Sequence, residues 1–400
     1  MCRHETVTPD SGPTPASPRR RFLLADAMIL VAATAIGWGV TLTIARAGRQ
    51  SPYDLFANFV RPDSWFDVRG VVGKILELAL LAMPMIAAVT LALLPIRLFG
   101  ARPRFHRLAR QPGLTTSCAS ALAVAFVVLP VTIGAMAAGC DGEALCRLLT
   151  REEKVLSVTM YGGLAVLVSW LTLLLGGAWS AEASWIDRLG RALGLSWIVA
   201  ASAVWPVLLF VEMTATRCYA RPVVDSPSVV EGVGRGILQV NATLMPVVAV
   251  VTTALLAIRL VCVGPRFRRL ARQPGMLAGC ASGLSMALIG LELIVILLTN
   301  FAFSDDGQFW EEISAFPEWL LGKEMQTRLA MSGGFAVLVS WTTLLVGRRW
   351  HAARGWPDRC ARVLGLCWIL AALVVASGNA LIQADYERLS QRATGVPVDP

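Results

Sequence analysis

The sequence predicts an all-α integral membrane protein, a polytopic bundle of about nine transmembrane helices, from three observations. Charge is scarce, because 56% of the 400 residues are hydrophobic and only 16% are charged, against about 25% in soluble domains. The apolar residues form runs of about 20 or more, which lets a helix cross a hydrocarbon core about 30 Å thick. An internal repeat divides these helices into two four-helix units and one extra helix.

The predicted spans follow the apolar runs, and the connections between them are short. The spans cover residues 22–46, 71–96, 114–139, 155–178, 193–216, 236–261, 276–303, 329–347 and 363–384. No connection is long enough to fold as a separate domain, so any activity must lie within the membrane or on short loops.

The chain begins with a polar, proline-rich segment, residues 1–21, which we expect to be a disordered cytoplasmic tail. The sequence RRRFLL at 19–24 imitates a twin-arginine signal. However, the apolar stretch that follows is longer than the roughly 7–15 residues of a signal core. We therefore interpret it as an uncleaved first helix.

Basic residues predict the orientation of the helices. The net charge is +9, but the arginines gather on alternate connections, which is the positive-inside pattern of membrane proteins and needs no nucleic acid partner. This pattern places the N-terminus in the cytoplasm, and nine crossings place the C-terminal tail, residues 385–400, outside. The preference for Arg over Lys is typical of a compositional bias in bacterial genomes, so the predicted location is the bacterial inner membrane, a plasma membrane.

Long stretches of the sequence occur twice. PRFHRLARQPG at 103–113 returns as PRFRRLARQPG at 265–275, with ten of eleven positions identical. GGLAVLVSWLTLLLG at 162–176 likewise returns at 333–347, and WIDRLGRALGLSWI at 185–198 returns at 356–369 as WPDRCARVLGLCWI. The spacing is 162 residues before the loop between the seventh and eighth spans and 171 after it, so this loop carries an insertion of nine residues.

The repeat predicts a tandem arrangement of two units in the same orientation. We place the first four-helix unit at 22–178, the second at 179–347, and a ninth helix with its basic inner loop at 348–384. Because each unit crosses the membrane an even number of times, a pseudo-twofold axis along the membrane normal relates the units most simply.

The two repeated basic loops have two interpretations. Their arginines, spaced three residues apart, are Arg104, Arg107 and Arg110 in the first loop and Arg266, Arg269 and Arg272 in the second. They orient the neighbouring helices, or they also bind anionic lipids or a cytoplasmic subunit.

Small residues and prolines occupy matching places in the two units. Close helix packing is predicted where small residues recur, namely at Gly162, Gly163 and Ser169 and at Gly333, Gly334 and Ser340. Pro84 and Pro246 fall within the second and sixth spans, where each removes a backbone hydrogen bond. Such matched kinks suit a transporter hinge but also occur routinely in membrane helices.

Four residues are the polar candidates inside the membrane. Trp170 and Trp341 follow the packing serines at mid-membrane, where each indole N–H needs an acceptor on a neighbouring helix. Glu292 lies in the long apolar seventh span, where an unpaired carboxylate costs about 2.5 kcal/mol or more. It therefore needs protonation or a partner, and Asn241 and the Trp341 indole are the candidates for that partner.

Two pairs of residues lie on the predicted outer side. Lys74 and Glu77 are three residues apart on one helix, which predicts an ion pair. Cys140 and Cys146 are close enough in sequence for a small loop disulfide in an oxidising compartment, and two free thiols are equally compatible with this spacing.

No catalytic signature accompanies these features. The three histidines, His4, His106 and His351, fall in polar inner segments, and the sequence has no HExxH motif and no phosphate-binding glycine loop. We therefore expect no enzyme, no metal and no cofactor. A small-molecule or ion permease, or the membrane component of a transport system, fits a duplicated bundle with an intramembrane acid. The alternative is a noncatalytic membrane scaffold or sensor that binds a partner or anionic lipids through its basic loops.

Overall fold

The computed structural model describes ten helices joined by short turns. Its described residues are 24–47, 68–99, 110–180, 184–218, 229–263, 273–303, 323–348, 350 and 356–393. The helices are α1 (Leu24–Ala47), α3 (Val68–Phe99), α5 (Pro112–Ala137), α6 (Gly142–Thr150), α7 (Glu152–Leu175), α8 (Trp185–Cys218), α9 (Val229–Val263), α11 (Pro274–Phe303), α13 (Lys323–Val346) and α14 (Trp356–Ala393).

The predicted class, an all-helical membrane protein, is confirmed at this level. Eight of the described helices are long and apolar enough to span a membrane: α1, α3, α5, α7, α9, α11, α13 and α14. The predicted fifth span coincides with α8, which has ample length but whose side chains after Trp205 lie outside the described part.

Local sequence signals set several helix ends. Pro112, at the first position of α5, fits there because the first N–H groups of a helix have no intrahelical acceptor. Asp141 caps the short amphipathic helix α6, because its Oδ1 accepts a hydrogen bond from the Ala144 N–H at 2.7 Å. Past the end of α7, Gly177 adopts a φ of 59°, a left-handed conformation that glycine tolerates.

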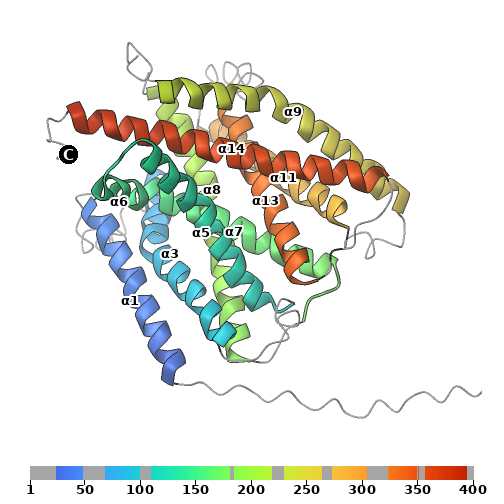
Figure 1. Ribbon diagram of the computed structural model, residues 1–400, viewed down its shortest axis with the longest axis horizontal. Coiled ribbons are helices and arrows are strands. Elements are labelled where there is room, and N and C mark those ends of the chain that lie inside the picture. The colour runs from blue at the N-terminus through green and yellow to red at the C-terminus, as the bar shows by residue number, and fades with distance from the viewer. Residues whose placement is uncertain are drawn as a thin grey trace, which may run out of the picture.

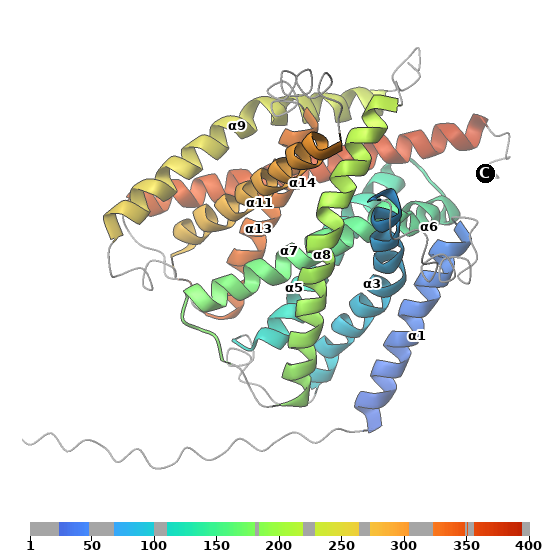
Figure 2. The same cartoon turned by 180° about the vertical axis from the view of Figure 1, so that it is seen from behind.

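The long helices converge at one end of the molecule and spread apart toward the other (Figure 1). At the first end lie α6, the start of α7 and the last turns of α14, and we call it the α6 end. At the other end α5 begins at Pro112 and α8 begins at Trp185, and we call it the Pro112 end. The view from behind shows the same arrangement, with the helices close together at the α6 end and farther apart at the Pro112 end (Figure 2).

The main core lies where α7 meets α13. All four helices α3, α5, α7 and α8 pack against one another, and so do α9, α11, α13 and α14. The two groups meet through α7 with α13 and through α5 with α14. Helix α1 packs along α3, whereas α8 and α9 have no comparable contact among their described residues.

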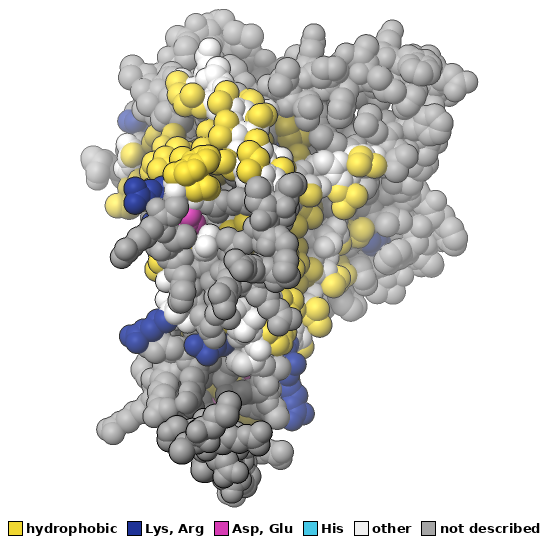
Figure 3. Space-filling view, turned by 90° about the vertical axis from the view of Figure 1, so that its right-hand side faces the viewer, with side chains coloured by type: hydrophobic (Ala, Val, Ile, Leu, Met, Phe, Trp, Pro, Cys, Tyr) yellow, Lys and Arg dark blue, Asp and Glu magenta, His cyan; other side chains and the backbone are white. Residues whose placement is uncertain are grey.

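The outer faces of the helices are apolar, as expected for contact with lipid. Exposed large hydrophobic side chains include Val31 on α1, Val250 on α9 and Leu370 on α14. Seen from the side where α9 ends and α14 begins, hydrophobic side chains cover a broad area with Lys and Arg at its edges (Figure 3).

Candidate functional site

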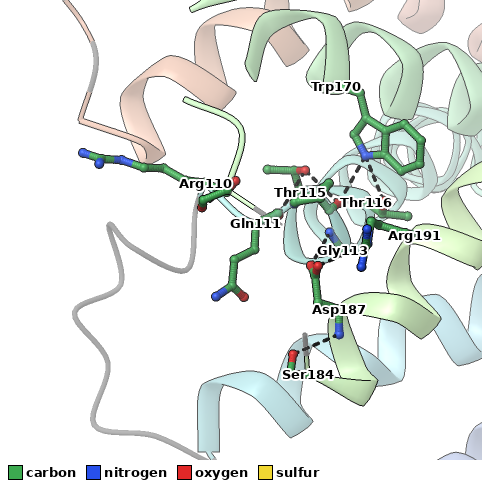
Figure 4. A network of polar contacts seen from close by, with 11 residues as sticks. Arg110, Gln111, Gly113, Thr115, Thr116, Trp170, Ser184, Asp187 and Arg191 are labelled. Carbon is green, nitrogen blue, oxygen red and sulfur yellow. Dashed lines mark hydrogen bonds and ion pairs between the residues drawn. The ribbon is translucent and has the colours of Figure 1, made fainter. Parts of the chain in front are cut away.

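A buried aspartate joins the start of α8 to the start of α5 (Figure 4). The Asp187 side chain is 0% exposed, and its Oδ1 accepts a hydrogen bond from the Gly113 N–H at 3.0 Å. Its other oxygen, Oδ2, lies 3.2 Å from Nε of Arg191, one turn along α8. A carboxylate at a helix N-terminus satisfies a backbone N–H and is favoured by the helix dipole. Asp187 therefore fixes α5 to α8.

Trp170 ties α7 to the same turn of α5 (Figure 4). Its Nε1 donates to the carbonyl oxygen of Pro112 at 3.1 Å and to Oγ1 of Thr116 at 3.2 Å. Glycine at position 194 of α8 makes room for the indole, because a Cβ there would lie 2.5 Å from the ring. The first turn of α5 is thus held by both α7 and α8.

The second half of the chain makes the same contacts at the start of α11. Oδ1 of Asp358 accepts from the Gly275 N–H at 3.2 Å, and its Oδ2 lies 3.1 Å from Nε of Arg362. Nε1 of Trp341 donates to the Pro274 carbonyl oxygen at 3.0 Å. Sequence analysis predicted acceptors on a neighbouring helix for both tryptophans. Both indoles bond to the first turn of the neighbouring helix, and their position at mid-membrane stays a prediction.

The packing glycines receive the tryptophan of the following helix. A Cβ on Gly162 would lie 2.1 Å from the ring of Trp197, and one on Gly333 would lie 2.3 Å from the ring of Trp368. Nε1 of Trp197 donates to Oγ1 of Thr90 at 3.2 Å, and Nε1 of Trp368 donates to Oγ1 of Thr252 at 3.1 Å. These bonds connect α8 to α3 and α14 to α9.

The remaining small residues lie in the same interfaces. A Cβ on Gly163 would lie 2.2 Å from Cβ of Ala201, and one on Gly334 would lie 2.1 Å from the carbonyl oxygen of Trp368. The Ser169 and Ser340 hydroxyls are buried and donate to carbonyl oxygens of their own helices, at Val166 and Val337, each at 2.9 Å.

The two prolines lie inside continuous helices, Pro84 in α3 and Pro246 in α9. Of the two prolines, only Pro84 lies against a glycine of another helix within the described residues. A Cβ on Gly37 of α1 would lie 2.9 Å from the Pro84 carbonyl oxygen. Whether either proline acts as a hinge stays a prediction.

Several predicted residues fall outside the described part of the structure. These are Arg104, Arg107, Arg266, Arg269 and Arg272, together with the side chain of Glu292, for which only a place on α11 is given. Arg110 is described, and its carbonyl oxygen accepts from the Ser180 backbone N–H at 3.1 Å.

The two pairs that we expected on the outer side have clear outcomes. The ion pair between Lys74 and Glu77 is confirmed, with Nζ 3.5 Å from Oε2. Cys140 and Cys146 are free thiols, and Sγ of Cys140 donates to the carbonyl oxygen of Ala384 at 3.8 Å.

A set of polar side chains near the α6 end was mostly missed by sequence reasoning. Lys154 of α7 bonds Gln383 of α14 through Nζ and Oε1. Arg328 of α13 interacts electrostatically with Tyr161 of α7, whose side chain is buried. Asn241 of α9, the one member singled out in advance, is 7% exposed. A comparison of each position with its counterpart in the other half would have drawn attention to the rest.

Comparison with protein-family models, curated proteins and solved structures found no match to this chain.

Proposed function

We propose that this protein is a small-molecule permease, or the membrane component of a transport system, built from two equivalent four-helix units. Helices α3, α5, α7 and α8 form one unit, α9, α11, α13 and α14 form the other, and α1 is the extra helix. The sequence predicted a division at residue 178 instead. We prefer the present grouping because it gives each unit a complete set of the aspartate and tryptophan contacts.

Matched contacts support the grouping. The Asp187–Gly113 bond corresponds to Asp358–Gly275, and Trp197–Thr90 corresponds to Trp368–Thr252. Because α7 packs against its own counterpart α13, the pseudo-twofold axis of this proposal passes between these two helices. With nine crossings, the Pro112 end is cytoplasmic and the α6 end faces outward.

The observation that carries the transport proposal is a cation at the seam, the surface where α7 packs against α13. Arg328 lies in the second turn of α13 and interacts with the buried Tyr161 of α7. Ionisable side chains within membrane spans commonly mark the path of a solute or ion, because lipid cannot solvate them. Transporter sites also commonly lie at the interface between repeats.

Further features lie along the same seam. The rings of Phe126, Tyr161 and Phe335 are in mutual contact, with centroids 4.6 to 5.4 Å apart. Nearer the Pro112 end, α5 and α13 line an apolar cavity of about 30 Å³, with Thr115 and Thr342 among its walls. Such a volume admits about one water molecule, so a solute path there requires the two units to move apart.

Flux into proteoliposomes tests the proposal. The purified protein should move at least one of acetate, benzoate, glycine, glycerol or phosphate faster than protein-free vesicles do. If Glu292 couples transport to protons, Glu292→Gln should fold normally but abolish the pH dependence of uptake. Wild-type uptake in both Glu292→Gln and Glu292→Leu would remove this acid from the mechanism. No flux of any of the five solutes would overturn the permease and favour the scaffold.

A further inference from the structure

The apolar cavity between α5 and α13 is a partly open groove at the boundary of the two units. One wall is the beginning of α5, from Leu114 to Leu122, and the other is the end of α13, from Val339 to Val346. The side chains of Leu122 and Val346 are partly exposed, so the groove opens to the surroundings of the bundle. It lies at the Pro112 end, because Leu114 is in the first turn of α5 and Val346 is the last residue of α13.

The threonines of the groove offer no free hydroxyl to an occupant. Oγ1 of Thr115 donates to the Pro112 carbonyl oxygen at 2.9 Å. The hydroxyls of Thr342 and Thr343 donate to carbonyl oxygens one turn back in α13, each at 2.8 Å. The other lining residues are Cys, Ala, Val and Leu. A molecule in the groove therefore makes apolar contacts, and beside two helices that can span a membrane the apolar molecules at hand are lipid acyl chains.

The groove is a departure from the internal repeat. Residues separated by 162 or 171 positions correspond before and after the nine-residue insertion, respectively. On this basis the counterparts of Thr115 and Thr342 are Leu277 and Leu171. Leucine fills more space than threonine, and Leu277 is buried, at 2% exposure. Since the repeated packing accepts leucine at both positions, the fold does not require the shorter threonines that leave the groove open.

Arg110 lies directly before the α5 wall of the groove. The carbonyl oxygen of the next residue, Gln111, accepts from the N–H groups of Leu114 and Thr115, both at 3.1 Å. The Arg110 side chain extends away from Asp187 (Figure 4) and is partly exposed. Its Nε is buried and has no hydrogen-bond partner among the described residues. A guanidinium N–H in this state is a strong donor for an anionic oxygen.

Arg348 lies directly after the α13 wall, in a backbone conformation that favours glycine. Its N–H donates to the carbonyl oxygen of Leu345 at 3.0 Å, its side chain is exposed, and its φ is 48°. The counterpart position holds Gly177, with a φ of 59°. Because a side chain at positive φ costs free energy that glycine avoids, the turn itself does not explain the arginine. Arg110 and Arg348 thus place positive charge at the same end of both walls.

We propose that the groove and these two arginines form a binding site for a phospholipid with an anionic headgroup. One acyl chain lies along the groove between α5 and α13, and Arg110 and Arg348 donate to the phosphate oxygens. The positive-inside pattern predicts that this end is cytoplasmic. Anionic lipids concentrate in that leaflet, and basic pockets between membrane helices bind their headgroups. Such a lipid bridges the two units whether or not the protein transports a solute.

Native mass spectrometry of the full-length protein in detergent measures the binding of added lipid. Phosphatidylglycerol should bind at least tenfold tighter than phosphatidylcholine with the same acyl chains. Soluble glycerol 3-phosphate at the same concentration should not compete. The groove variant Thr115→Leu/Thr342→Leu introduces the counterpart residues, and the charge variant is Arg110→Gln/Arg348→Gly. Each should weaken phosphatidylglycerol binding at least tenfold and keep the melting temperature measured without lipid.

Matched controls carry the same kinds of substitution away from the groove. Thr34→Leu on the exposed side of α1 and Arg147→Ser on α6 should bind phosphatidylglycerol as the wild type does. If a double variant does not fold, Thr342→Leu or Arg348→Gly alone gives the same test at a more exposed position. Equal binding of the two lipids, competition by glycerol 3-phosphate, or wild-type binding in either the groove variant or the charge variant would overturn the site.

Discussion

At the residue scale, Asp187 and Asp358 explain why parts of the repeat are nearly identical. Each accepts the N–H of the glycine in the RQPG sequence and pairs with an arginine one turn along its own helix. The need of a buried indole N–H for an acceptor was predictable from Trp170 and Trp341. Their acceptors, the carbonyl oxygens of Pro112 and Pro274, were not, because sequence does not show which helix start lies beside them.

Replacing Asp187 by alanine should destabilise the protein. The buried Gly113 N–H would lose its acceptor, at a cost of about 2 kcal/mol, and the partly exposed Arg191 would lose its ion pair. Asp358→Ala should have a similar effect, and the melting temperature in detergent measures both. Ser196→Ala, on the exposed side of α8, is the control. Equal melting temperatures for Asp187→Ala and the control would show that this contact contributes nothing to stability.

At the element scale, apolar runs located the helices well but their ends poorly. The span predicted at 193–216 is part of a helix from Trp185 to Cys218, and the span at 363–384 is part of one from Trp356 to Ala393. A run of apolar residues marks only the crossing of the hydrocarbon, whereas the helix continues through polar turns such as the one containing Asp187. Helix α6 was missed because it is short and amphipathic, although Asp141 is a recognisable N-cap.

Close packing of α7 on α8 and of α13 on α14 depends on glycine. Gly163→Leu and Gly334→Leu should each reduce the folded yield in detergent, because even a Cβ would lie within 2.2 Å of a neighbouring atom. Gly39→Leu on α1, where a Cβ meets nothing within 4 Å, is the matched control. Yields and melting temperatures of both mutants equal to those of the control would contradict the observed packing.

At the scale of the whole molecule, the sequence predicted duplication but did not decide which helix is the extra one. The ILVAATA sequence of α1 resembles both WIVAASA of α8 and WILAALV of α14, so the repeat can be divided in more than one place. Packing favours α1 as the extra helix, because α7 packs on α8 as α13 packs on α14. Lys154 and Arg328 near the α6 end escaped prediction because they depart from the repeat rather than follow it.

Reporter fusions test the central proposal, two equivalent units in the same orientation within nine crossings. Alkaline phosphatase is active only outside the cytoplasm, so we expect activity after residue 400 and none after Gly113 or Gly275. A cytoplasmic reporter such as green fluorescent protein should show the reverse. Different locations for the Gly113 and Gly275 fusions would contradict units of the same orientation, and an inactive phosphatase after residue 400 would contradict nine crossings.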